Sequence, residues 1–271
     1  MKHALVDGQP REALRSLKGE CPICGAPMIP KCGSVRVRHW AHLSDDGVDH
    51  RWEPETEWHR DWKGEFPEEW QEVIHHASNG ERHIADVKTK QGRVIEFQNS
   101  DISEEERRSR EEFYRPMWWV VNGWRLKRDR PQFFETLRRG RIRRVKPLAL
   151  SVPLDSCMLL QKWGDSRVSV FFDFGPDEEP SDTPRFGGRV LWASRLRRTN
   201  GTAVLIPVYR ENFVKSAITG TRLEGIDCSQ AFKRERRVFL IVRRLPYPKT
   251  RSGWRDEYIP WKRRSRRARR F

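Results

Sequence analysis

The chain has few cysteines, no long apolar segment and no apolar stretch at its start, and each absence excludes a class of protein. No apolar run approaches the roughly 20 residues that a helix needs to span a bilayer, so we expect no membrane partner. The opening residues, MKHALVDGQPREAL, lack the apolar centre of a secretion signal. Of the five cysteines, three cluster within twelve residues and two are isolated, which is a poor disulfide pattern. The sequence therefore predicts a reduced, soluble, cytoplasmic protein.

Charge is present in excess but is unevenly spread over the 271 residues, whose net charge is +16. Residues 53–112 carry 9 Lys/Arg against 17 Asp/Glu, whereas residues 113–271 carry 37 against 15. Hydrophobic residues make up 36%, with 12 Trp and 13 Phe, which excludes a disordered chain. The basic half suits a polyanion such as nucleic acid, and the acidic segment suits cations.

Paired cysteines and histidines near the start predict a structural zinc site. Cys21 and Cys24 form C-x2-C, and after fourteen residues His39 and His42 form H-x2-H. Thiolate and imidazole are the ligands that tetrahedral zinc prefers. Cys32 is an alternative ligand in place of one histidine. A module of roughly 40 residues needs a stabilising metal of this kind, because it cannot bury an adequate hydrophobic core by itself.

A helix is expected to begin near Pro54 and to continue to about Trp70. Proline suits the first turn of a helix, and early acidic residues favour its positive end. Trp58 and Trp62 lie one turn apart and would anchor the helix to a sheet.

Three polar residues share one face of this expected helix. Glu55, His59 and Lys63 fall at i, i+4 and i+8. They form either ordinary helical ion pairs or one wall of a metal site. Ideal helix geometry favours Glu55 over Glu57 as the acid of that face.

Two β-type runs, HIADV and VIEFQ, flank Lys-Gln-Gly and predict a hairpin. Gly92 suits the left-handed corner of a three-residue loop. Thr89 then pairs with Arg93, and Asp86 lies opposite Glu96 with Cβ atoms roughly 5 Å apart. A two-residue turn would instead place the two acids on opposite faces.

The two facing acids predict a metal-dependent phosphodiesterase site. Carboxylates this close repel unless a cation or proton lies between them, and Mg²⁺ prefers oxygen ligands. Gln98 lies two residues beyond Glu96 and shares its face. Solvated charges on an amphipathic hairpin are the alternative.

Downstream, Ser103 and Glu106 form the capping box of a helix that ends before Pro116. The apolar run MWWVV predicts a buried strand. From residue 147, apolar runs separated by Gly/Pro/Asp-rich turns predict a second, β-rich α+β domain.

Several of these pieces occur together in a known family. In order along residues 19–125, CPIC, HWAH, ETEWHRDWK, ADV, IEFQNSDIS, a helix with Arg110 and Tyr114, and WWVVNG resemble the competence protein CoiA-like family. That family is assigned to the PD-(D/E)XK nuclease superfamily. The resemblance implies that Asp86 and Glu96 are the motif acids, whereas Gln98 stands where the superfamily usually has lysine.

The resemblance also implies which other residues complete the site. The E-T-x-x-H-x-x-x-K helix would contribute Glu55, His59 and Lys63. Either Lys63 or Lys88 would supply the ammonium that Gln98 lacks, and Gln98 would orient a water molecule. Mg²⁺ or Mn²⁺ would be the catalytic ion at Asp86 and Glu96.

The sequence thus predicts an α/β to α+β protein in four parts: a zinc-binding module (1–50), a nuclease-like core with a mixed sheet flanked by helices (51–146), a basic β-rich domain (147–260) and a basic tail (261–271). The expected activity is metal-dependent DNA cleavage. The resemblance adds a context of incoming or recombining DNA and of DNA-uptake proteins as partners. Two alternatives are a non-catalytic zinc-finger DNA-binding protein and an RNA-directed enzyme.

Overall fold

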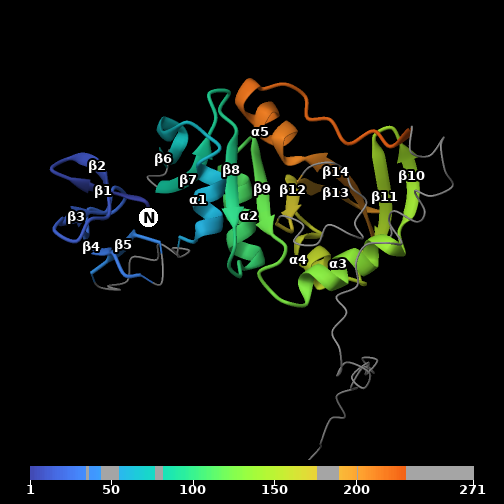
Figure 1. The fold of residues 1–271 in the computed structure, drawn as a ribbon, viewed down its shortest axis with the longest axis horizontal. Helices are drawn as coiled ribbons and strands as arrows, with labels where there is room; N and C mark the ends of the chain where they lie inside the picture. The colour runs from blue at the N-terminus through green and yellow to red at the C-terminus, as the bar shows by residue number, and fades with distance from the viewer. Residues whose placement is uncertain (35–36, 44–54, 77–81, 176–188, 200, 230–271) are drawn as a thin grey trace, which may run out of the picture.

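The computed structural model describes residues 1–34, 37–43, 55–76, 82–175, 189–199 and 201–229. It is a mixed α+β protein with two sheets (Figure 1). The predicted tail at 261–271, Pro54 and the end of the expected C-terminal domain lie outside these residues. Within them, no helix is long and apolar enough to cross a membrane.

The first sheet belongs to the N-terminal module and has the strand order β2-β1-β3-β4-β5. Its strands are β1 (His3–Val6), β2 (Gln9–Glu12), β3 (Gly19–Glu20), β4 (Pro27–Lys31) and β5 (His39–His42). A small core surrounds the fully buried Trp40 and includes Met1, Ala4, Ala13, Cys21 and Met28. So few buried side chains agree with the expectation that this module needs a further source of stability.

The second sheet has nine strands in the order β10-β11-β14-β13-β12-β9-β8-β7-β6. They are β6 (Gln71–His76), β7 (Arg82–Lys88), β8 (Val94–Gln98), β9 (Met117–Asn122), β10 (Arg141–Val145), β11 (Leu148–Pro153), β12 (Ser169–Asp173), β13 (Val190–Thr199) and β14 (Thr202–Tyr209). The helices are α1 (Glu57–Lys63), α2 (Glu104–Phe113), α3 (Asp129–Arg138), α4 (Met158–Trp163) and α5 (Arg210–Thr219), with a 3₁₀ turn, η1, at Glu68–Trp70.

This sheet does not stop where we expected a domain boundary, near residue 146. Strand β12 pairs in parallel with β9, with Ser169 opposite Trp118 and Asp173 opposite Asn122. The strands expected to form a separate β-rich domain therefore extend the sheet of the nuclease-like segment. The apolar edge of β9 explains the difference, because all six of its residues are buried and need a neighbour on both sides.

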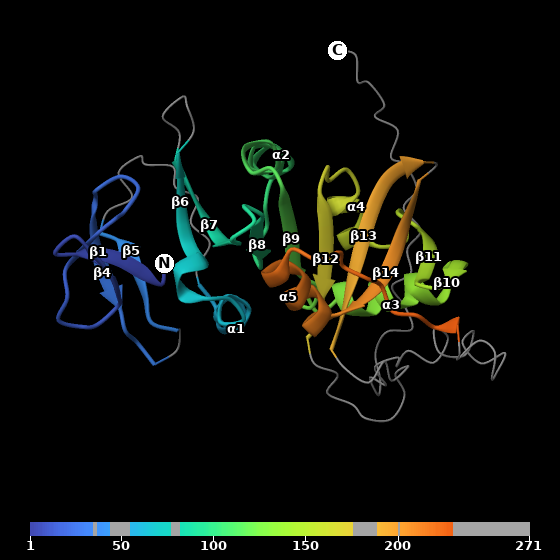
Figure 2. The same cartoon turned by 90° about the horizontal axis from the view of Figure 1, so that it is seen from above.

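Helices cover both faces of the nine-stranded sheet (Figure 2). Side chains of α1 and α5 pack on one face around Trp62 and Phe213. Side chains of α3 and α4 pack on the other face around Phe133 and Trp163. The protein therefore has one apolar layer on each side of a central sheet.

Helix α1 is shorter than the sequence predicted, because it begins at Glu57 rather than near Pro54. Thr56 is the N-cap residue: its hydroxyl accepts from the backbone N–H of His59, and the His59 ring accepts from the backbone N–H of Thr56. This reciprocal pair fixes the first turn. Glu55 therefore precedes the helix, and Trp70 lies in η1.

Asp173 holds α1 against the sheet. This completely buried carboxylate accepts from the indole N–H groups of Trp58 (3.0 Å) and Trp62 (2.9 Å) and pairs with Arg189 (2.6 Å). The prediction that the two tryptophans anchor the helix to the sheet is confirmed. Their anchor lies more than a hundred residues away, on β12.

Candidate functional site

The predicted hairpin register is confirmed. Val87 pairs with Ile95 and Lys88 with Val94, and the Thr89 N–H donates to the Arg93 carbonyl at 2.8 Å. Gly92 has φ of +80°, the left-handed corner that a three-residue loop requires. Counting outward from the turn through these pairs sets Asp86 opposite Glu96.

The two acids replace the ladder hydrogen bonds of the hairpin at this point. The Asp86 N–H donates to Glu96 Oε1 at 3.2 Å, and the Phe97 N–H donates to Asp86 Oδ2 at 2.9 Å. Each carboxylate thus satisfies a backbone group of the opposite strand, which fixes its position. Asp86 keeps a quarter of its side chain exposed, whereas Glu96 is almost wholly buried.

Glu96 has an unusual acidity. Burial and the nearby Asp86 carboxylate raise its pKa to about 8, although the Arg110 guanidinium acts in the opposite direction. Arg110 extends from α2 and pairs with Glu96 Oε2 at 3.0 Å and with Glu106 at 2.9 Å. Binding of an additional cation next to Asp86 and Glu96 would therefore be favourable at neutral pH, because it would reduce the repulsion between the two carboxylates.

Lys63, from the last turn of α1, lies among three carboxylates. Its Nζ is 3.0 Å from Glu72, 3.2 Å from Asp86 and 3.6 Å from Glu55. Burial acts to lower its pKa, but the three acids outweigh burial and raise it. Lys63 is therefore a permanent cation beside the acid pair. Lys88, the alternative source of an ammonium, makes no ion pair in the part of the chain that the structure describes.

Sequence reasoning missed Glu72. Strand β6 pairs with β7 so that Gln71 faces Val87 and Val73 faces Ala85. The register of β6 and β7 therefore sets Glu72 across from Asp86, which completes a row of three acids over β6, β7 and β8. Extending the register count to the strand before HIADV would have found it.

Glu72 also ties the N-terminal module to this row. Its carboxylate accepts from the backbone N–H groups of Lys2 (2.8 Å) and His3 (3.0 Å) as well as from Lys63. These contacts and the Lys63 ammonium outweigh the effect of burial and hold the pKa of Glu72 well below its usual range. Its φ of +51° is uncommon for a residue with a side chain. A single buried carboxylate therefore joins β1, α1 and the acidic row.

His59 lies next to the row, but both of its ring nitrogens are engaged. Nδ1 accepts from the backbone N–H of Thr56, and Nε2 lies 2.9 Å from the carbonyl oxygen of Phe97. This arrangement selects the neutral tautomer with the proton on Nε2. His59 therefore positions the start of α1 against β8. Its suggested catalytic role remains a prediction.

Glu55 and Tyr114 are buried beside the row with unsatisfied polar atoms. The two carboxylate oxygens of Glu55 have no hydrogen-bond partner among the described residues. The same is true of the Tyr114 hydroxyl. Burying such groups is costly. Glu57, in contrast, is exposed, so the preference for Glu55 as the acid of this face is supported by its burial.

These residues fit a hard divalent ion. Asp86 and Glu96 offer adjacent oxygen ligands. The raised pKa of Glu96 shows that its carboxylate form is destabilised here, and a bound cation would stabilise that form. Glu55 adds carboxylate oxygens that have no hydrogen-bond partner among the described residues. Gln98 is buried next to Glu96 on β8, and its amide N–H donates to the Ser100 hydroxyl at 3.2 Å. The predicted site residues of the hairpin and of α1 are thus brought together.

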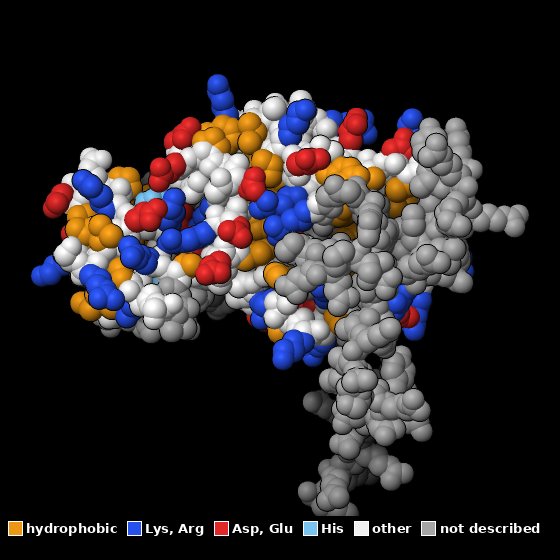
Figure 3. Space-filling view, in the orientation of Figure 1, with side chains coloured by type: hydrophobic (Ala, Val, Ile, Leu, Met, Phe, Trp, Pro, Cys, Tyr) orange, Lys and Arg blue, Asp and Glu red, His pale blue; other side chains and the backbone are white. Residues whose placement is uncertain are grey.

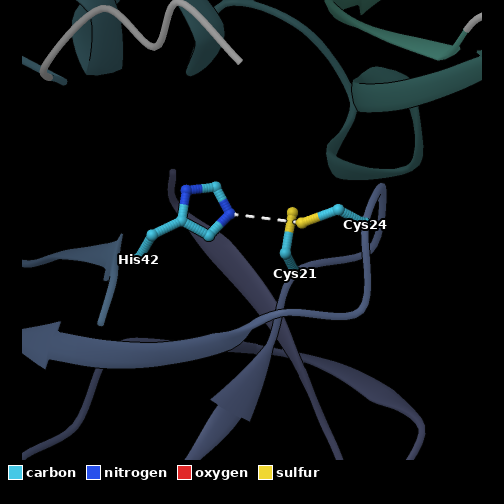
Figure 4. A group of neighbouring side chains, drawn as sticks. All are labelled: Cys21, Cys24 and His42. Atoms are coloured by element: carbon cyan, nitrogen blue, oxygen red, sulfur yellow. Dashed lines mark hydrogen bonds between the residues drawn. The ribbon is translucent and has the colours of Figure 1, made fainter. Parts of the chain in front are cut away.

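A second cluster lies in the N-terminal module, where Cys21, Cys24 and His42 converge (Figure 4). Their ligand atoms lie within 4.8 Å of one another, and Cys24 Sγ is 3.5 Å from His42 Nε2. A zinc ion with ligands at about 2.0–2.3 Å needs ligand atoms roughly 3.5 Å apart, so the three donors fit it. Burial raises the pKa of the Cys21 thiol.

The other two candidates for this site lie elsewhere. His39 is buried with Nδ1 2.8 Å from the Val37 carbonyl oxygen, and Cys32 donates to the Ala13 carbonyl. The role of His39 as a fourth ligand remains a prediction, and in this structure His39 does not lie with the other three donors. The reason is that HWAH forms strand β5, and residues three apart on a strand point to opposite faces.

Comparison with known proteins identifies this module. Residues 6–47 match the family model of the competence protein CoiA, N-terminal domain. The match lies within the N-terminal module and supports the resemblance to the CoiA-like family there. It does not extend to the segment that carries the acidic row. No curated protein and no solved structure matches the chain.

Proposed function

We propose that this CoiA-like protein is a divalent-metal-dependent DNA nuclease with a competence-related role. The observation that carries the proposal is the row of acids on β6–β8, in which Asp86 and Glu96 face each other and are flanked by two fixed cations. The match to the CoiA N-terminal domain supports the competence-related role. A role in DNA uptake, together with DNA as substrate, belongs to this proposal.

Asp86 and Glu96 would hold Mg²⁺ or Mn²⁺, with Glu55 as a nearby acid. The bound ion would polarise a phosphoryl oxygen and lower the pKa of a water molecule. Lys63 and Arg110 would offset the negative charge that develops on the phosphate, which is the task of the lysine that Gln98 replaces. Gln98 would orient the attacking water by hydrogen bonding.

A second candidate is a non-catalytic DNA-binding protein on a nuclease-like scaffold. It is favoured by the pairing of every acid in the row with a cation of the chain itself, since Lys63 and Arg110 already provide partial neutralisation. The same pairing would keep a site without bound metal stable.

Cleavage of plasmid and single-stranded DNA in Mg²⁺, Mn²⁺ or EDTA distinguishes the two. Asp86→Asn and Glu96→Gln keep the size of each side chain and should each reduce metal-dependent cleavage at least about 100-fold. Glu105→Ala, at an exposed position of α2, is the matched control and should cut normally. If the folded wild type cuts no DNA with either metal, the scaffold function replaces the nuclease.

A further inference from the structure

A pocket of 520 Å³ lies at the end of the nine-stranded sheet remote from the acidic row. Three arginines (Arg139, Arg141 and Arg143) and two hydroxyl residues (Ser151 and Thr202) contribute to its walls. Strands β10 and β11 carry it, at the far end of the sheet from β6 and the N-terminal module (Figure 1). Among the residues that the structure describes, none that lines the pocket is acidic.

Local geometry brings these side chains together. Arg141 pairs with Ser151 across β10 and β11, so the two side chains share a face. A register shift between Ile142 and Arg144 inserts Arg143 as an extra residue. Arg141 and Arg143 lie two residues apart, a spacing that places side chains on one face of a strand, so both can line the same pocket.

A tight turn places Arg139 over this surface. Gly140 joins α3 to β10, and a Cβ atom there would lie 2.9 Å from both the Leu137 carbonyl oxygen and a methyl group of Val152. Only glycine therefore allows the helix to end so close to β11. Arg139, the C-cap residue of α3, is held by Glu135 at 2.8 Å.

Two of the three pocket arginines, Arg141 and Arg143, differ from the arginines beside the acidic row. On α2, Arg107, Arg108 and Arg110 all pair with carboxylates. Arg141 and Arg143 are exposed, and neither forms an ion pair with any part of the chain that the structure describes. Planar guanidinium groups bind phosphate oxygens through two parallel hydrogen bonds, and the hydroxyls of Ser151 and Thr202 add donors of a suitable kind.

We propose that the arginine pocket of β10 and β11 binds the phosphate backbone of DNA and anchors it away from the acidic row. The choice of DNA rests on the proposed function, whereas the choice of phosphate rests on the side chains. Six strand intervals separate β10 from β8, or about 29 Å at about 4.8 Å each. One turn of duplex DNA has a similar length, about 34 Å, so one duplex can reach both places.

The test measures equilibrium binding in EDTA, where no cleavage occurs. Fluorescence anisotropy with a labelled 20-base-pair DNA duplex compares the full-length wild type with the double variant Arg141→Glu/Arg143→Glu. The control, Lys215→Glu/Arg222→Glu, makes the same change in net charge at exposed positions outside the pocket. On the face drawn in Figure 3, basic and acidic side chains are interspersed over the N-terminal module.

We expect the pocket variant to bind at least about tenfold more weakly and the control less than threefold. The plot of log affinity against log salt should also become shallower by about 1.8, because two phosphate contacts are lost at about 0.9 each. Arg141→Gln/Arg143→Gln should give an intermediate loss, and melting temperatures establish that each variant is folded.

Three results would overturn the proposal. Equal weakening in both charge-reversal variants would show that only net charge matters. Unchanged binding would show that the arginines do not bind DNA. Their role would then be to prevent the edge strand β10 from pairing with other chains. Preferential loss with an RNA duplex rather than DNA would assign the pocket to RNA. Because the assay needs no cleavage, absence of nuclease activity would not affect it.

Discussion

Two side-chain clusters that could bind metal ions are built in different ways. Cys21, Cys24 and His42 meet at the surface of a small sheet, where Cys24 is exposed and a cysteine and an imidazole contact each other. Asp86 and Glu96 meet inside a large sheet, where Lys63 and Arg110 of the chain already pair with them.

This difference indicates different roles for the two sites. The soft Cys/His set belongs to a module with a small core, as expected of a structural metal. The carboxylate set is stable through its own cations, so a metal there would bind more weakly and exchange more easily. The predictions below test this contrast, from the largest expected effect to the smallest.

The largest effect should follow loss of the surface cluster. His42→Ala should reduce bound zinc from about one ion per chain to nearly none and destabilise the N-terminal module, because zinc binding contributes to folding. His39→Ala is the matched control and should keep its zinc, since His39 does not join the cluster. Metal analysis of the purified proteins measures both. Equal loss in the two variants would restore His39 as a ligand.

Removing the buried ammonium should be the next largest effect. Lys63→Gln leaves Glu55, Glu72 and Asp86 without their shared cation and should lower the free energy of unfolding by about 3–5 kcal/mol. Lys88→Gln on β7 removes the same charge at a position without such partners and should cost less than about 1 kcal/mol. Urea denaturation measures both values. Similar losses would mean that Lys63 is not the centre of the acidic cluster.

The anchor of α1 should matter somewhat less. Asp173→Asn leaves Arg189 without its counter-charge and weakens the acceptor for Trp58 and Trp62, so we expect a loss of about 2–4 kcal/mol. Tryptophan fluorescence should report the change during denaturation. Asp227→Asn, at an exposed ion pair, should leave stability nearly unchanged.

The last prediction concerns how stability depends on pH in the absence of divalent metal. Because the pKa of Glu96 is raised from 4.5 to about 8, the folded protein keeps this proton where the unfolded chain loses it. Its contribution to stability is therefore complete below about pH 4.5 and is lost progressively as the pH rises to about 8.

Glu96→Gln should remove this pH dependence, so the stability difference between wild type and variant should shift in favour of the variant between pH 5 and about 8. Thermal melting in EDTA across that range measures the shift. A constant difference would show that Glu96 ionises normally.

Local sequence determined the parts of this protein that depend on near neighbours. Gly92 and the alternation on either side of it fixed the hairpin register, and with it the meeting of Asp86 and Glu96. The C-x2-C spacing brought Cys21 and Cys24 together, and Ser103 capped α2 by accepting from the Glu106 N–H. In each case the geometry is set within a few residues, so pattern and turn chemistry are sufficient.

Tertiary structure decided what depends on distant segments. Glu72 joins the acidic row only because β6 pairs with β7, and Asp173 receives α1 only because β12 lies next to β9. The same pairing merged two expected domains into one sheet. His39 lies apart from Cys21, Cys24 and His42 because its segment forms strand β5. Sequence patterns specify which face of an element is apolar, whereas the choice of neighbouring strand depends on the packing of the whole chain.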